Sequence, residues 1–132
     1  MAFTHDLRAA ANRHLQAADL LYADPGHRKD VAGYLYDIAA ECAIKYMVIS
    51  LRLPTEQSKK TIHYAHFPEL RTRLRDALTG RRAGPVWAFI MNDVFMHNWD
   101  IAMRYADAKQ IKKEWVDDWQ AQAKDVVGAM GA

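Results

Sequence analysis

Side chains suited to binding an anion lie in the stretch HNWDIAMRYADAKQIKKEW, which spans residues 97–115. Arg104 carries a planar guanidinium whose donors match phosphate or carboxylate. A helix N-terminus near Asp107 would add free N–H groups that favour an anion. The structural alternative is an ion pair between Arg104 and Asp100, four residues apart, that fixes the junction into the last helix. Tyr105 is interpreted as a packed aromatic rather than a catalytic acid.

A second group of polar residues contains Glu41, Lys45 and His66. Glu41 and Lys45 are four residues apart, in the order that favours an ion pair on a helix. His66 directly precedes an apolar helical pattern, so we expect it to cap that helix or to pair with the Glu41/Lys45 flank. A functional role for this group requires Lys45 to face a cleft shared with Arg104.

Basic residues concentrate in the middle of the chain, as KK at 59–60, RTRLR at 71–75 and RR at 81–82. If Arg71 and Arg75 converge with Arg104, they form a patch for a polyphosphate or an RNA backbone. The alternative is a solvated surface. The tryptophans at 99, 115 and 119 offer stacking surfaces for bases, although a core or a dimer interface uses tryptophan as readily.

No metal or cofactor site is predicted. His63 and His66 are three residues apart, but Glu69 is the only carboxylate close to them in sequence, and the single cysteine, Cys42, lies in an apolar run typical of a buried core residue. The N-terminus becomes charged within a few residues and lacks the apolar core of a signal peptide. No apolar run is long enough to span a membrane, so we expect a cytoplasmic protein.

The chain of 132 residues predicts one domain, residues 1–132, with an ordinary soluble composition and a net charge of only +2. This charge is too small to indicate nucleic acid by itself. Helical periodicity recurs along most of the chain and no segment resembles a strand. We therefore predict an all-α bundle of about five helices, at about 4–23, 29–52, 68–80, 85–95 and 106–130, with residues 53–68 as a polar connector.

Three motifs resemble the HEPN domain family (higher eukaryotes and prokaryotes nucleotide-binding). AAECAIKYMVISLRLP contains an approximate form of the family's pattern on the second helix, with Glu41, Ala43 and Lys45. HFPEL places His66 before the next helix, and RYAD places Arg104 and Tyr105 before the last one. Alanine follows this Arg-Tyr pair where the family usually has proline. The resemblance covers residues 18–130 and implies a four-helix up-and-down core.

The resemblance implies one of two functions. Many HEPN proteins are metal-independent RNases, often toxins, with an Arg-x(4–6)-His motif completed across a dimer interface. Here only Arg8 and His14 have that spacing, in the first helix rather than late in the domain, and residues six apart point in different directions from a helix. Other members bind nucleotides or act beside a nucleotidyltransferase.

We therefore predict a HEPN-like module that binds a ligand rather than catalysing a reaction. It is expected to form a homodimer and to bind a nucleotide, RNA or a protein partner. Its predicted ligand-binding residues are Glu41, Lys45, His66, Arg104 and Tyr105. The first alternative is an RNase with an atypical site, in which His14 or His66 is the general acid/base and Arg8 or Arg104 stabilises the phosphate. The second is a helical dimer that only binds another protein, such as one half of a toxin–antitoxin pair.

Overall fold

The protein is described by a computed structural model covering residues 5–24, 28–49, 51, 55–78 and 84–131. None of these residues is in a β-strand, and the predicted all-α bundle is confirmed. The described residues form six α-helices and two short 3₁₀ helices. In chain order they are α1 (Leu7–Ala23), α2 (Lys29–Val48), α3 (Glu56–Tyr64), α4 (Glu69–Leu78), α5 (Pro85–Ile90), η1 (Ile101–Tyr105), η2 (Ala108–Gln110) and α6 (Lys113–Gly128).

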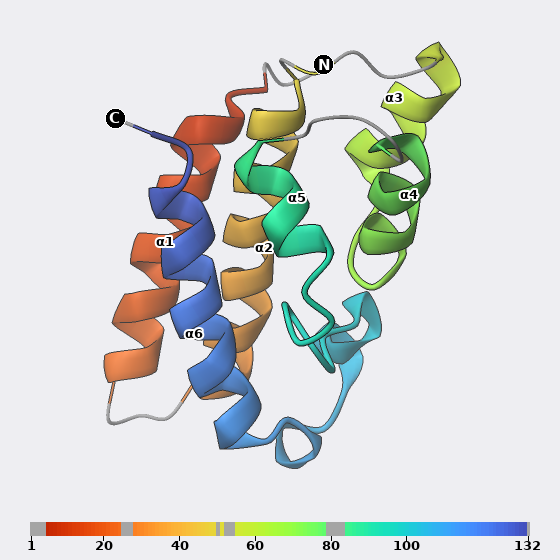
Figure 1. The fold of residues 1–132 in the computed structure, drawn as a ribbon. Helices are drawn as coiled ribbons and strands as arrows, with labels where there is room; N and C mark the ends of the chain where they lie inside the picture. The colour runs from red at the N-terminus through yellow and green to blue at the C-terminus, as the bar shows by residue number, and fades with distance from the viewer. Residues whose placement is uncertain (1–4, 25–27, 50, 52–54, 79–83, 132) are drawn as a thin grey trace.

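Three long helices, α1, α2 and α6, lie side by side, and the shorter α5 packs on α2 (Figure 1). The α3–α4 pair lies at the other side of α2, beside α5. Small side chains on α1 and α2 allow the two helices to approach closely, because alanine occupies many of the buried positions there. These fully buried alanines are Ala11, Ala18, Ala32, Ala39, Ala40 and Ala43.

Helices α2 and α6 approach each other closely at Gly33. A Cβ atom built at Gly33 would lie 2.8 Å from a ring carbon of Trp119 and 3.2 Å from Val116 Cγ2. Trp119 is 1% exposed and its indole N–H donates to the carbonyl of His97 at 2.8 Å. Glycine is therefore required at position 33 so that the largest core side chain can lie flat against α2.

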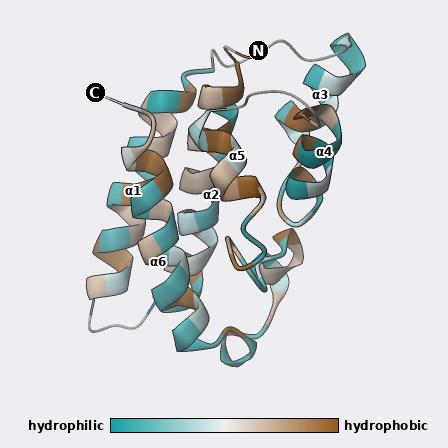
Figure 2. Cartoon of the chain, in the orientation of Figure 1, coloured by the Kyte–Doolittle hydropathy of each residue, from teal (hydrophilic) through white to brown (hydrophobic). Residues whose placement is uncertain are grey.

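Helix α3 corrects the predicted polar connector at residues 53–68. Thr55 is its N-cap, and the hydroxyl oxygen accepts the backbone N–H of Ser58 at 3.0 Å. Only Ile62 is buried on this helix, and α3 is largely hydrophilic in Figure 2. A helix this short and polar shows no apolar stripe, so the periodicity in the sequence does not reveal it.

Other helix boundaries also differ from the predicted ones. The first helix is capped by Asp6, whose carboxylate accepts the N–H of Ala9 at 3.0 Å; the predicted cap, residue 4, lies outside the described residues. The second helix ends at Val48, and residue 52 is likewise not described. The last helix begins at Lys113 rather than at 106 or 107, because Asp107 caps the η2 turn instead, with its carboxylate on the N–H of Lys109.

The predicted helix at 85–95 ends at Ile90, and an irregular segment, residues 91–100, follows it. Within this segment Met96 and Asn98 have positive φ angles of 53° and 69°, a conformation that ends a right-handed helix. Side chains from two helices hold the segment. Gln122 of α6 accepts the N–H of Met96 and donates to the carbonyl of Val94, both at 2.8 Å.

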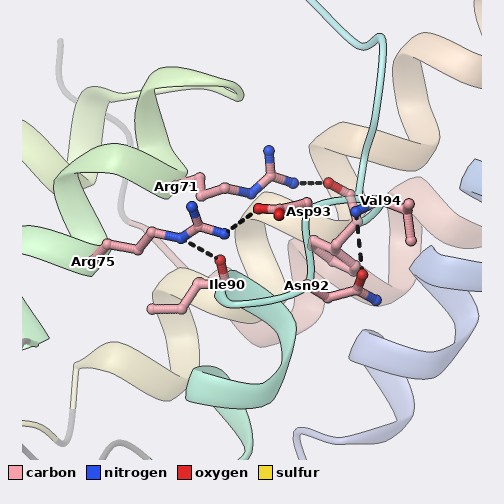
Figure 3. A network of polar contacts seen from close by, with 7 residues as sticks. Arg71, Arg75, Ile90, Asn92, Asp93 and Val94 are labelled. Carbon is pink, nitrogen blue, oxygen red and sulfur yellow. Dashed lines mark hydrogen bonds and ion pairs between the residues drawn. The ribbon is translucent and has the colours of Figure 1, made fainter.

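Two arginines of α4 reach the same segment from the other side (Figure 3). Arg71 donates to the carbonyl of Phe95. Arg75 donates to the carbonyl of Ile90 at 2.8 Å and pairs with Asp93 at 2.8 Å. These contacts join α4 to the end of α5 and satisfy backbone groups that the irregular segment leaves without helical partners.

No helix among the described residues is both long and apolar enough to cross a membrane.

Candidate anion-binding site

Two carboxyl groups are buried in the middle of α2, one turn apart. Asp37 is 0% exposed and Glu41 is 2% exposed, and they are the buried charged residues of the described chain. Glu41 accepts two hydrogen bonds from the segment that precedes α4. His66 Nδ1 lies 2.7 Å from Glu41 Oε1, and the backbone N–H of Phe67 donates to Oε2 at 3.0 Å. Glu41 therefore fastens the α3–α4 connection to α2.

The predicted pairing of His66 with the Glu41/Lys45 flank is confirmed. Because an ionised carboxylate only accepts, His66 Nδ1 carries the hydrogen that lies between the two groups. The imidazole ring is also 6.3 Å from the buried ring of Trp99. The His66 side chain remains 40% exposed, so His66 connects the buried carboxyl group of Glu41 with solvent.

Asp37 is the residue of this cluster that the sequence did not reveal. Among the described residues, neither of its carboxyl oxygens makes a hydrogen bond of ordinary geometry, although Glu41 lies close enough to act on it. Burial first, and then the negative charge of Glu41, raise the pKa of Asp37 well above its ordinary value. The proton therefore stays on Asp37 under conditions in which an exposed aspartate loses it.

Lys45 lies one turn further along α2, at the edge of this cluster. Its ammonium nitrogen is 3.9 Å from Glu41 Oε1, which is an electrostatic contact but is longer than a hydrogen bond. The side chain is only 10% exposed. Within the described chain, no side-chain or backbone oxygen accepts a hydrogen bond from it. A nearly buried ammonium group thus retains donors for a ligand.

A pocket of about 400 Å³ opens next to Lys45, between the end of α2, α3 and the start of α1. Its polar lining comes from three lysines and one histidine, and most of its remaining lining is aliphatic. The lining residues are Leu7, Lys45, Val48, Ile49, Leu51, Lys59, Lys60, Ile62, His63 and Tyr64. The volume falls within the range of pockets that hold small organic ligands, which is roughly 300–1,000 Å³.

The positive charge of the pocket comes from its lysines. Lys59 pairs with Glu56 at 2.9 Å on the exposed side of α3, whereas Lys60 has no carboxylate partner within the described chain. The pKa of His63 is lowered by burial, and further by His5 and Lys45. His63 is therefore a neutral wall of the pocket near pH 7, stacked on His5 with ring centroids 4.7 Å apart.

A second pocket, of about 470 Å³, has a different character. It is lined by Tyr46, Met47, Ile49, Leu51, Gly84, Pro85, Val86, Ala129 and Met130. None of these described lining residues is charged, so within the part of the chain that the structure describes the first pocket is the candidate site for an anion.

Arg104 and Tyr105 do not join this site. They lie on η1, both exposed, with the Arg104 guanidinium 5.2 Å from the centre of the Tyr105 ring. The expected pair with Asp100 is not among the ion pairs of the described residues, because that carboxylate caps η1 by accepting the N–H of Ala102 at 2.8 Å. Neither residue lines the pocket that contains Lys45, so the expected cleft shared by Lys45 and Arg104 is not formed.

The other predicted phosphate contacts are also engaged in the fold. Arg71 and Arg75 hold the 91–100 segment (Figure 3), so these guanidinium groups donate to carbonyls of the fold. Of the tryptophans, Trp99 and Trp119 are buried and Trp115 is half-buried against the core. This agrees with the packing interpretation rather than with base stacking.

The residues of the atypical RNase motif do not meet. Arg8 donates to the carbonyl of Gly131 at 2.8 Å and lies over the ring of Tyr46. His14 bonds through Nδ1 to the carbonyl of Ala10 at 2.7 Å. Each side chain is held by a different part of the fold. Across the described ranges, no group of three His, Cys, Asp or Glu side chains has an arrangement that could hold a metal ion.

Comparison with protein-family models, curated proteins and solved structures gives no match for this chain. The resemblance to the HEPN family therefore stays a prediction from the sequence motifs, and the site is argued from its geometry alone.

Proposed function

We propose that this chain is a helical binding module for a phosphate-bearing small molecule of the nucleotide class, held in the pocket next to Lys45. The observation that carries this proposal is the Lys45 ammonium group. It is 10% exposed, lines the pocket and has no hydrogen-bond acceptor within the described chain. An ammonium held out of water favours an anionic oxygen strongly, because charge-assisted hydrogen bonds are stronger where the dielectric constant is low.

The rest of the lining supports a ligand with both an anionic and a flat apolar part. Lys59 and Lys60 come from the facing helix α3 and add positive charge at the mouth. Ile62 and the neutral His63 ring form an apolar wall, and Tyr64 is 74% exposed next to them with its ring 4.8 Å from His63. Exposed aromatic rings of this kind stack with nucleobases.

The proposal involves no catalysed reaction. An RNase would need an arginine and a histidine directed at one scissile phosphate, and the residues predicted for that role bind separate parts of the fold. RNA cleavage through His66 stays an untested alternative from the sequence. A homodimer, a nucleotidyltransferase partner or a toxin–antitoxin partner likewise rests on the family resemblance, and no contact in the single chain favours one of them.

A thermal-shift titration tests the proposal with ATP, GTP and a short RNA as separate probes. A ligand at one hundred times its Kd that binds only the folded state stabilises it by about 2.7 kcal/mol, which raises the Tm by several degrees for a domain of this size. Lys45→Gln removes a charge-assisted hydrogen bond and is expected to weaken ATP binding about 10- to 100-fold.

Lys60→Gln and Arg104→Ala complete the design. Both residues are exposed, so neither change is expected to unfold the protein, but only Lys60 lines the pocket. Weaker binding by Lys60→Gln together with normal binding by Arg104→Ala supports the pocket. Stabilisation that disappears in Arg104→Ala and persists in both lysine variants would place the ligand elsewhere.

A further inference from the structure

One carboxyl oxygen, Glu41 Oε1, lies close to two basic side chains, those of Lys45 and His66. Lys45 Nζ is 3.9 Å from it and His66 Nδ1 is 2.7 Å from it. Lys45 faces the pocket, whereas His66 does not line it. The ligand site and the half-exposed imidazole therefore both lie next to the same buried carboxyl oxygen.

We propose that anion binding in the pocket is coupled to proton uptake by His66. This inference rests on the proposed function, since it requires an anion at Lys45. An anionic ligand neutralises Lys45, and Glu41 then loses the positive group that offsets its buried charge. Protonation of His66 replaces this lost partner, because the imidazolium ring keeps its Nδ1–H bond to Glu41 and adds a full charge.

Glu41 cannot compensate by moving to other partners. It is 2% exposed, and its second oxygen holds the N–H of Phe67. A buried carboxylate with no positive neighbour is strongly unfavourable, so the coupling has a definite sign. Histidine is the side chain whose charge ordinarily changes between pH 5 and 8, and the exposed edge of His66 allows a proton to enter from solvent.

The surrounding ionisable groups do not provide the same coupling. Asp37 on α2 already keeps its proton, because burial and Glu41 raise its pKa. Arg71 on α4 is charged and donates to the carbonyl of Phe95, and Arg13 on α1 acts through its charge on the Cys42 side of α2.

His63 on α3 is the competing proton acceptor, because it lines the pocket itself. It has no contact with Glu41 within the described chain, and its pKa is lowered first by burial and then by its neighbours His5 and Lys45. Lys59 and Lys60 on the same helix are cations at neutral pH and do not change charge between pH 6 and 8. The test must therefore separate His66 from His63.

By linkage, a ligand that draws a proton onto the protein binds more tightly when protons are abundant. We expect the affinity for ATP to rise by about fivefold or more between pH 8 and pH 6, the lower end of the coupling usual for two linked sites. ATP changes its own protonation in this range, so the comparison that matters is between proteins at the same pH.

The experiment is isothermal titration calorimetry of ATP into the wild-type chain, His66→Asn and His63→Asn, at pH 6, 7 and 8. Each pH is measured in two buffers of different ionisation enthalpy, so that the number of protons taken up is obtained directly. The asparagine at position 66 keeps a donor for Glu41 but cannot change its charge. We expect the wild type and His63→Asn to take up more protons than His66→Asn.

A second readout uses the folded wild-type protein and does not depend on any variant. The His66 ring is titrated by NMR with and without saturating ATP, and its titration midpoint is expected to move to higher pH when ATP is bound. Equal proton uptake by the wild type and His66→Asn, or an unmoved midpoint with ATP bound, overturns the coupling but leaves the pocket as a binding site. Absence of any ATP binding to the wild type overturns both the coupling and the proposed function.

Discussion

The buried carboxyl of Asp37 predicts an unusual dependence of stability on pH. The folded state holds the proton of Asp37 well above the ordinary carboxyl pKa of 3.8. The unfolded chain releases this proton near that ordinary value. In the window between the two, the folded state binds more protons, so the contribution of Asp37 to stability is complete below about pH 4 and is lost as the pH rises.

Asp37→Asn isolates this effect, since asparagine has the shape of the neutral acid and does not titrate. In the window one proton separates the two states, so the wild type loses about 1.4 kcal/mol of unfolding free energy per pH unit relative to the variant. Titrating groups that do not interact with Asp37 are common to both proteins and cancel in the difference; Glu41, which interacts with Asp37, is the exception. We therefore expect Asp37→Asn to become progressively more stable than the wild type as the pH rises above 4.

Urea unfolding of both proteins at half-unit steps from pH 3.5 to 8 measures this difference, with the two-state free energy obtained by linear extrapolation. The control is Asp118→Asn, because Asp118 is exposed on α6. A free-energy difference between Asp37→Asn and the wild type that stays constant from pH 4 to pH 8 would refute the reasoning. It would mean that Asp37 ionises in the folded protein as it does in the unfolded chain.

Three further outcomes are expected. Gly33→Ala pushes a methyl group against the ring of Trp119 and should lower the free energy of unfolding by about 1–3 kcal/mol. Gly128→Ala is the control, because its added Cβ meets nothing within 4 Å and should not destabilise the protein. Equal effects of the two substitutions would contradict the close packing at Gly33. Gln122→Ala removes two hydrogen bonds to the 91–100 segment and should lower the free energy of unfolding by about 1–3 kcal/mol. The control is Gln110→Ala, because Gln110 is exposed. Equal urea midpoints for the two variants would contradict this prediction. The family resemblance predicts a homodimer, so light scattering should give twice the chain mass of 15.1 kDa; a monomer at high concentration would contradict it.

The sequence predicted the helical class because apolar residues recur every three or four positions along most of the chain, with no strand-like alternation. On α2 the buried positions recur every three or four residues, from Ala32 to Val48. The same periodicity conceals Asp37, because a polar residue within a buried stripe has no distinctive spacing of its own. Its environment depends on what packs over α2, which a helical pattern does not specify.

Helix α3 was missed for the opposite reason. The N-cap of α3, Thr55 followed by a polar turn, can be recognised in the sequence. Only Ile62 is buried on this helix, however, so the position of α3 depends on its packing against other parts of the chain. Lys59 and Lys60 line the same pocket as Lys45 only because α3 lies across that pocket from the end of α2. The proximity of these three lysines is a tertiary contact, which no residue spacing in the sequence predicts.

The interpretation of single charged residues had mixed outcomes, because the structure forms the Glu41–Lys45 and Glu41–His66 pairs but directs Arg71 and Arg75 to unpredicted partners. Glu41 and Lys45 are one helical turn apart, and their pairing follows from geometry. Arg71 and Arg75 also share a helix face, but their partners are carbonyls of the 91–100 segment (Figure 3). These carbonyls are available only because residues predicted as helix form an irregular segment, and the conformation at Met96 and Asn98 gave no signal in the sequence.

The measurement that tests the central claim most directly is a map of ATP binding by amide chemical shifts. If the pocket next to Lys45 holds the anion, the backbone amides around residue 45 and across residues 59–64 move together with increasing ATP. Those of Arg104 and Tyr105, which do not line the pocket, stay in place. Shifts that centre on residues 101–105, or an unchanged spectrum at millimolar ATP, would contradict the assignment of this pocket as the binding site.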